Sequence, residues 1–393
     1  MKMEGFRLQR SNNVLVTRAH VYKDETSSRF TLRRYENGDE WAIVALLKAA
    51  FGKWHTLNYW RWMYQKNPAG KPIIWVAQHG KTIIGHHAII PVRMKTARAN
   101  MMGSQGVNAA THPSYQGRGV FSSIVARCHR DAGNHNLPLT FGFSKKRIEP
   151  ILKKYARRVH IGSMVSMVKV LNWKPLLARY VPCDALLRTA NSSFRKTTRL
   201  KSVSPRGKEN LEIERISRFD ERINRFWNAI WRNFQIIVIR DQEYLNWRYP
   251  DNPEGNYVIY VASKNKRILG YCVLKEDHRE DMTVGLIVDI LGFQNGKKVV
   301  SCLIQTAVEH FQKRNVDLVV CMMSEKNPYE AAFMKAGFIE SPFRRMALTC
   351  TINLPGEANN RRVTSDRALI LSQGSFLKEK KNWFMMFGDS NWT

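Results

Sequence analysis

Apolar residues follow strand-like and helical spacings along the chain, and these spacings predict a mixed α/β protein. Residues 30–35 and 73–78 carry the β-branched and aromatic residues typical of strands, whereas residues 39–51 place apolar side chains at helical intervals. The other elements predicted before residue 160 are strands at 82–92, 103–111 and 139–143, and helices at about 119–133 and at 146–155.

A long internal repeat sets the organisation of the chain. Residues 59–85 align without a gap with residues 244–270, and 12 of the 27 aligned positions are identical, among them Trp62 with Trp247 and Tyr64 with Tyr249. Average composition gives about two such matches by chance. The repeat predicts two related halves, because self-similarity at a fixed offset is typical of duplicated units.

The second half repeats the element order of the first. The elements predicted in it are strands at 257–263, 267–276, 284–292 and 317–323, and helices at 297–314 and 327–336. We therefore expect an α/β (α+β) fold with two domains, residues 1–185 and 211–393. A basic linker at 186–210, rich in polar residues, is expected between them.

Charge distinguishes this chain from an average globular protein. Its 393 residues include 63 Lys and Arg against 32 Asp and Glu, a net charge of +31. Such an excess favours a nucleic acid or another polyanion as partner. Residues 145–208 alone hold 17 Lys and Arg with two acids, Glu149 and Asp184. No RRM, KH, zinc-finger or basic-zipper motif accompanies this charge.

Cysteine spacing and hydropathy limit the kinds of site and the cellular location that the sequence predicts. The six cysteines are far apart, with no CxxC, so neither a disulfide framework nor a metal site is predicted. No apolar run reaches 18 residues, which excludes a predicted membrane-spanning helix. Residues 1–10 have no apolar signal core, so we expect a cytoplasmic protein.

The most distinctive local motif is the segment GVNAATHPSYQGRGVFSSI at residues 106–124. A strand runs into Gln116-Gly117-Arg118-Gly119 and then into a helix, whose first amides are unpaired and carry a partial positive charge. Glycines let an anion approach the backbone, and Arg118 adds a cation, so the segment suits a pyrophosphate. It is neither a P-loop nor a dinucleotide fingerprint. An ordinary strand–helix turn is the alternative.

This segment resembles motif A of the GNAT family of N-acetyltransferases, Q/R-x-x-G-x-G/A. Gln116 takes the first position and Gly119 the required glycine, whereas Phe121 stands where the family has Gly or Ala. The predicted element order resembles the GNAT fold in both halves, over roughly residues 30–172 and 211–340. In the second half, 327–338 resembles the common GNAT ending, yet 288–298 lacks the paired glycines.

The resemblance implies tandem GNAT domains, the first binding acyl-CoA and the second degenerate. The second half would then form a wall of the acceptor site or only stabilise the first. The implied reaction transfers an acetyl or other acyl group from acetyl-CoA, a co-substrate, to a primary amine of a small molecule, by direct attack in a ternary complex. The residues implied in binding acyl-CoA are Ala109, Ala110, Thr111, Gln116, Gly117, Arg118, Gly119, Val120, Phe121 and Ser144.

The catalytic groups are less evident. The general base in this family is often a carboxylate on the fourth strand, where this chain has Asn108. His112 is the first alternative, with His86, His87 or a water chain as others. The family's acid is a tyrosine on the fourth helix, for which Tyr155 is the best substitute. Structural roles for these histidines and for Tyr155 remain the plainer alternatives.

Other interpretations stay open. The charge supports a nucleic-acid or polyanion binder, or a tRNA-dependent aminoacyl transferase of the same fold, and Asn108 leaves room for an inactive scaffold. The basic run 153–158 suits the adenosine 3′-phosphate, an acidic acceptor or a solvated surface. The aromatic segment 383–392 suits core packing or the acceptor site. The sequence does not choose between a monomer and a dimer.

Overall fold

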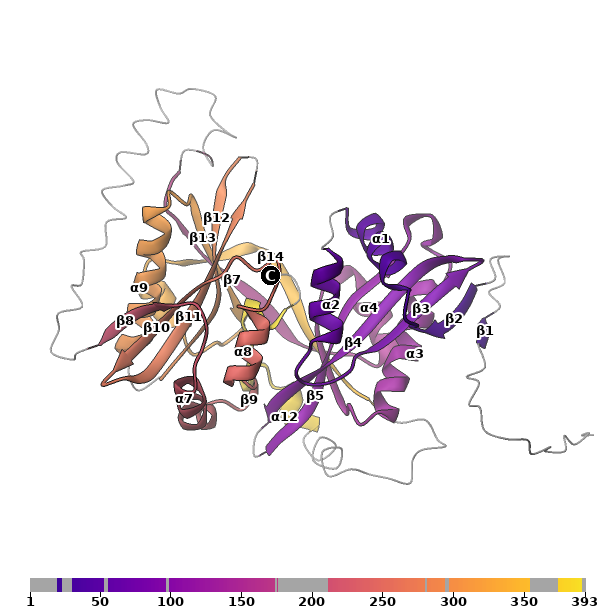
Figure 1. The fold of residues 1–393 in the computed structure, drawn as a ribbon, viewed down its shortest axis with the longest axis horizontal. Helices are drawn as coiled ribbons and strands as arrows, with labels where there is room; N and C mark the ends of the chain where they lie inside the picture. The colour runs from indigo at the N-terminus through magenta and orange to yellow at the C-terminus, as the bar shows by residue number, and fades with distance from the viewer. Residues whose placement is uncertain are drawn as a thin grey trace, which may run out of the picture.

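The computed structural model describes residues 20–22, 30–52, 56–96, 99–173, 175, 211–279, 281–293, 297–353 and 374–390. The predicted linker at 186–210 lies outside these residues. Figure 1 shows the first half, indigo to magenta, beside the second half, brown to orange, with β7 and β14 between them. The predicted α/β class with two related halves is confirmed, and the domain bounds stay a prediction.

The first half contains the elements that the apolar spacing predicts, with ends that differ by a few residues. Its strands and helices are β1 His20–Tyr22, β2 Phe30–Arg34, α1 Glu40–Phe51, α2 Leu57–Gln65, β3 Ile73–His79, β4 Thr82–Thr96, β5 Ala99–Thr111, α3 Val120–Asn134, β6 Leu139–Ser144, α4 Glu149–Ala156 and β7 Val159–Val170.

The second half follows the same plan. Its elements are β8 Glu212–Ile216, α7 Arg222–Ile230, β9 Ile236–Val238, α8 Gln242–Arg248, β10 Val258–Lys264, β11 Arg267–His278, β12 Thr283–Gly292, α9 Lys297–Lys313, β13 Leu318–Ser324, α10 Glu330–Lys335, β14 Ile339–Ile352, α12 Gly374–Lys378 and β15 Trp383–Phe384.

Helices α2 and α8 are absent from the predicted element order, and they join the two halves. The rings of Trp62 and Trp247 stack at 5.0 Å. Trp62 Nε1 donates to the carbonyl oxygen of Trp247 over 2.7 Å, and Trp247 Nε1 donates to that of Trp62 over 3.2 Å. Equivalent residues of the repeat therefore contact each other. Five of the nine residues of α2 are buried, so the helix lacks the broad polar face that reveals a surface helix.

The two halves exchange strands within one continuous sheet. The strand order is β1-β2-β3-β4-β5-β6-β14-β7-β13-β12-β11-β10-β8. Strand β14 of the second half lies between β6 and β7 of the first, with Cys350 opposite Phe141 and Leu348 opposite Gly162. Strand β7 in turn pairs with β13. Each half thus completes the sheet of the other, and one large apolar cluster runs through both.

Candidate functional site

The glycine segment forms an open turn at the start of α3. His112 directly follows β5, and its Nδ1 accepts a hydrogen bond of 3.3 Å from the Ser114 amide. Gly117 and Gly119 have left-handed φ values of 78° and 73°. Gln116 through Gly119 are exposed, and no side chain caps α3. The first amides of the helix therefore face an accessible turn, as an anion requires.

A cation and two aromatic rings lie against this turn. The Arg118 guanidinium lies 5.2 Å from the centre of the Tyr115 ring. The Tyr115 hydroxyl and His79 Nδ1 are 3.1 Å apart, so the ring is tied to the end of β3. The Arg118 charge is thus placed beside the turn. These features fit the diphosphate of a coenzyme, which is the fit that motif A implies.

Beside the turn, the sheet opens between β5 and β6. The two parallel strands pair only at Ser104 with Thr140 and at Gln105 with Phe141. On its other edge, β6 pairs with β14 as far as Ser144, opposite Ala347. Past Gln105, the edge of β5 is therefore unpaired with β6, as an extended amide-bearing ligand would need. The hydroxyls of Thr111 and Ser144, at the ends of β5 and β6, are buried and have no hydrogen-bond partner among the described residues.

Asn108 lies at a bulge of β5 and turns away from that edge. Its φ is 52°, and the pairing of β4 with β5 shifts opposite it, between His86 and Ala88. Its Nδ2 donates to the Tyr64 hydroxyl over 2.7 Å. Its carbonyl oxygen accepts from His86 Nδ1 over 2.9 Å. Burial raises the pKa of Tyr64, so this contact is a neutral one.

The second half has a carboxylate beside the bulge of β12, where the pairing with β11 skips Val288. Thr111 pairs with Gly85, and Gly292 pairs with the equivalent glycine, Gly270. Asp289 precedes Gly292 by the three residues that separate Asn108 from Thr111. The contact with the repeated tyrosine is also kept, since the Tyr249 hydroxyl donates to Asp289 Oδ2 over 3.1 Å. Sequence reasoning missed Asp289, because the gapless offset of 185 that relates Tyr64 to Tyr249 carries Asn108 to Phe293.

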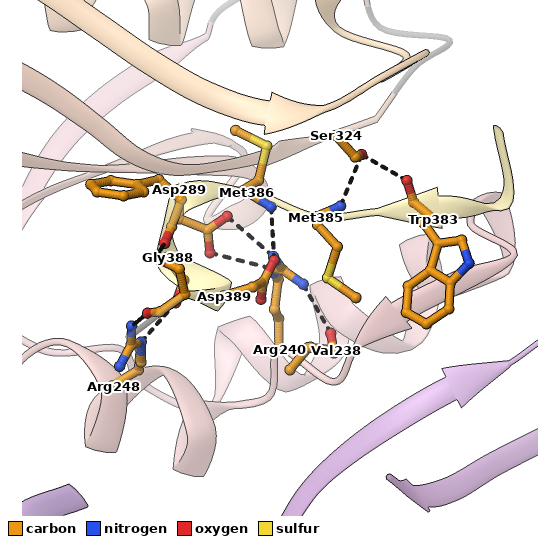
Figure 2. Close-up of polar contacts among 12 residues, drawn as sticks. Val238, Arg240, Arg248, Asp289, Ser324, Trp383, Met385, Met386, Gly388 and Asp389 are labelled. Carbon is orange, nitrogen blue, oxygen red and sulfur yellow. Dashed lines mark hydrogen bonds and ion pairs between the residues drawn. The ribbon is translucent and has the colours of Figure 1, made fainter. Parts of the chain in front are cut away.

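Asp289 is not free for chemistry, because it belongs to a buried ionic cluster (Figure 2). Arg240 Nε lies 3.2 Å from Asp289 Oδ2, and Arg240 Nη2 lies 2.7 Å from Asp389 Oδ2. All three side chains are at most 1% exposed. Burial raises the pKa of Asp389, although Arg240 opposes the shift. Through Asp389, the cluster holds the C-terminal segment, residues 383–390, in the core.

That segment also contacts the first half. Gln105 Nε2 donates to the Asp389 carbonyl oxygen over 2.8 Å, and Arg248 Nε donates to that of Gly388 over 2.7 Å. The aromatic and methionine residues from 383 to 386 are buried, with Trp383 and Phe384 each 2% exposed. Figure 2 shows Ser324 hydrogen-bonded to this stretch of main chain. The packing interpretation of the segment is thus confirmed for its described residues.

The histidines of β4 are buried and neutral. Burial lowers the pKa of His86 to about 4, and it lowers that of His87 well below its ordinary value. Each Nδ1 faces a carbonyl oxygen, of Asn108 and Val107 respectively, and therefore carries the proton. Such weakly basic imidazoles are poorly matched to an ammonium proton. The structure thus gives both histidines positions in the core.

These buried histidines predict acid sensitivity. A histidine whose folded pKa is depressed loses stabilising free energy as pH falls below its unfolded pKa of about 6.5. Burial lowers the pKa of His129 to about 3. We expect the free energy of unfolding to fall by about 1–2 kcal/mol per buried histidine between pH 6.5 and 5. Urea unfolding of His129→Asn should show a shallower pH slope than that of the wild type.

The predicted acid is an exposed residue of α4. Tyr155 is 41% exposed on α4, with Lys154 Nζ 5.3 Å from its ring centre. Its hydroxyl has no hydrogen bond to another residue in the described part of the chain. Val120 is buried at the start of α3, and Phe121 packs with α4 residues in a small apolar cluster. The structure thus brings the turn, β5 and Ser144 together, and leaves Tyr155 on the surface.

The described residues contain neither a membrane-spanning helix nor a cluster of metal ligands. No helix among them is long and apolar enough to cross a membrane. Within the same residues, no group of three or more His, Cys, Asp or Glu side chains is arranged to hold a metal ion. The five described cysteines are free thiols.

Comparison with solved structures identifies the fold. A GCN5-related N-acetyltransferase from Anabaena variabilis ATCC 29413 matches with a TM-score of 0.59 at 12% identity, over 82% of this chain and 73% of that one. N-myristoyltransferase of Saccharomyces cerevisiae with bound myristoyl-CoA matches with a TM-score of 0.58 at 12% identity, over 84% and 80%. A probable N-acyltransferase of Enterococcus faecalis V583 gives 0.58 at 11%, over 83% and 73%.

Sequence comparison locates the family. No curated protein sequence matches this chain. Residues 31–155 match the family model described as the acetyltransferase (GNAT) domain. That range contains the glycine turn, the opened edge of β5 and Ser144. Residues 31–155 therefore resemble a GNAT acetyltransferase domain, and the chain as a whole has the fold of its GNAT-type structural neighbours.

Proposed function

We propose that this chain is an acyl-CoA-dependent N-acyltransferase whose donor site is in the first half. One observation carries the proposal. The uncapped, glycine-bordered start of α3 lies next to a strand edge that β6 leaves unpaired. The first feature suits a diphosphate, and the second suits the amides of a pantetheine arm.

The residues of the turn and of β5 take distinct roles in this proposal. Gln116 through Gly119 and the first amides of α3, at Val120 and Phe121, hold the diphosphate, with Arg118 as its cation. The edge from Ala109 to Thr111 pairs with the pantetheine, and its amides polarise the thioester carbonyl. Ser144, whose hydroxyl is buried without a partner, faces the thiol end.

The acceptor in this proposal is a primary amine on a small molecule. Its nitrogen attacks the thioester carbon, so that a C–N bond forms, the C–S bond breaks and the amine proton ends on the released thiol. Since Asn108 replaces a carboxylate, we assign most of the acceleration to positioning, worth up to about 7–11 kcal/mol. His112 Nδ1 accepts from Ser114, so Nε2 carries the proton and serves as a donor near the turn. Tyr155 remains the proposed acid.

Two measurements on the full chain test the proposal. Calorimetric titration with acetyl-CoA should show one saturable site, and absence of binding would reject the donor site. Release of free thiol should then rise when a panel of primary amines is added. Binding without thiol release for any amine would favour the inactive scaffold. RNA binding that weakens steeply with log[salt], together with no response to acetyl-CoA, would favour the polyanion binder.

A further inference from the structure

The guanidinium of Arg158 is buried in the first half without a counter-charge. Arg158 follows α4 and is 7% exposed. Its Nη1 donates to Thr349 Oγ1 over 3.2 Å, whereas its Nε has no hydrogen-bond partner among the described residues. No carboxylate among the described residues forms an ion pair with it. Burial lowers its pKa to about 10, so it remains charged at neutral pH. An unpaired buried cation is unfavourable, and a binding anion relieves that cost.

Two glycines make room for this guanidinium where β5 and β6 begin to part. A Cβ at Gly106 would lie 2.5 Å from Nη2, and a Cβ at Gly142 would lie 2.7 Å from Nη1. These glycines directly follow Gln105 and Phe141, the last residues at which the two strands pair. The guanidinium therefore lies where β5 and β6 stop pairing, at the inner end of the opening between the two strands.

The neighbouring titratable groups do not supply the missing negative charge. His87 Cε1 is 3.5 Å from the point that a Cβ on Gly106 would occupy, and the rings of His87 and His129 are 5.9 Å apart. Burial, followed by neighbouring charge, lowers the pKa of both histidines, so both are neutral. Their Nε2 atoms have no hydrogen-bond partner in the part of the chain that the structure describes. The cluster thus presents one cation and unsatisfied polar atoms at the end of the opening.

We propose that Arg158 binds a carboxylate at the far end of the acyl group, so that the preferred donor is a coenzyme A thioester of a short dicarboxylic acid. This inference rests on the proposed function. Gly142 and Gly106 precede Ser144 and Ala109 by two and three residues, which is about 7–10 Å along a strand. A succinyl or glutaryl chain of about 4–5 Å plus a charge-assisted hydrogen bond of about 2.8 Å covers most of that distance.

Calorimetry on the wild-type full chain tests the inference without any variant. The probes are coenzyme A, butyryl-CoA and succinyl-CoA, of which butyryl-CoA keeps the four carbons and lacks the carboxylate. We expect succinyl-CoA to bind at least tenfold more tightly than butyryl-CoA. Equal affinities would overturn the Arg158 assignment while leaving the donor site intact. If coenzyme A itself does not bind, the proposed function fails together with this inference.

Two variants test whether Arg158 causes the preference for succinyl-CoA over butyryl-CoA. Arg158→Met keeps the bulk and removes the charge, so it should abolish the preference for succinyl-CoA, leave the affinity for butyryl-CoA unchanged and raise the unfolding temperature. Gly142→Ala displaces the guanidinium, so it should also reduce the preference for succinyl-CoA over butyryl-CoA. A preference retained in both variants would overturn the assignment. If instead Arg158→Met abolishes a preference for an amino acid over its amide as acceptor, the carboxylate belongs to the acceptor, and the donor assignment is wrong.

Discussion

Gly117→Trp should abolish coenzyme A binding, with a loss of affinity of at least about 100-fold (about 2.7 kcal/mol). The turn that contains Gly117 is exposed, and an added Cβ would meet no atom within 4 Å, so the fold tolerates the substitution. The indole instead fills the space in front of the first amides of α3, where the diphosphate must approach. Calorimetric titration with coenzyme A measures the effect.

Gly52→Trp is the matched control for this substitution. Gly52 has a φ of 81° against 78° for Gly117, and no atom lies within 4 Å of an added Cβ there either. Both variants therefore suffer a similar backbone strain of about 1–3 kcal/mol. Gly52 ends α1, outside the turn. We expect Gly52→Trp to bind coenzyme A as the wild type does, and an equal loss in both variants would contradict the assigned site.

Arg240→Met should destabilise the protein by about 3–5 kcal/mol at neutral pH, because it leaves two buried carboxylates without their cation. Arg240 contacts both Asp289 and Asp389, and its Nη1 also donates to the Val238 carbonyl oxygen over 3.0 Å. The variant should therefore release the C-terminal segment from the core. Urea unfolding followed by tryptophan fluorescence measures the change, with Trp383 as a reporter within the segment.

Two further variants check the physical reason for that effect. Arg222→Met breaks the exposed pair with Asp220 and should change stability by less than about 1 kcal/mol. Asp389→Asn removes a carboxyl group whose folded pKa is raised, so the wild type loses stability as pH rises above the ordinary carboxyl range. The Asn variant should lack that loss and be less destabilised than Arg240→Met. A loss in Arg222→Met as large as in Arg240→Met would contradict the role given to burial.

Much of the fold follows from the apolar pattern, because strands such as β3 and β4 are apolar runs bounded by turn residues, and helices such as α1 bury one face. The strand–turn–helix at residues 106–124 was predicted to within a residue or two for the same reason. Helix α2 was missed, since burial between the halves removes its polar face. The pairing of β14 with β6 could not be predicted either, because local spacing indicates a strand but not which distant strand it pairs with.

The candidate site, too, could be predicted only in part. The turn at Gln116–Gly119 is local, so residue type and order were enough to predict it. The roles of Asn108 and Asp289 depend on bulges and on tyrosines far away in the sequence, which only the fold brings close. The burial of Arg158 could not be predicted, because Arg158 lies in a basic run, 153–158, whose other Lys and Arg residues are exposed.

The position of β14 has a consequence during synthesis on the ribosome. Strand β6 ends at Ser144, and its partner begins at Ile339, so translation at about 5–20 residues per second leaves that edge bare for about 10–40 s. A nascent chain in this state presents an open sheet edge to its neighbours. Chaperone binding in that interval would protect the chain, and a stop codon placed before residue 339 should yield an aggregating fragment and not an isolated N-terminal domain.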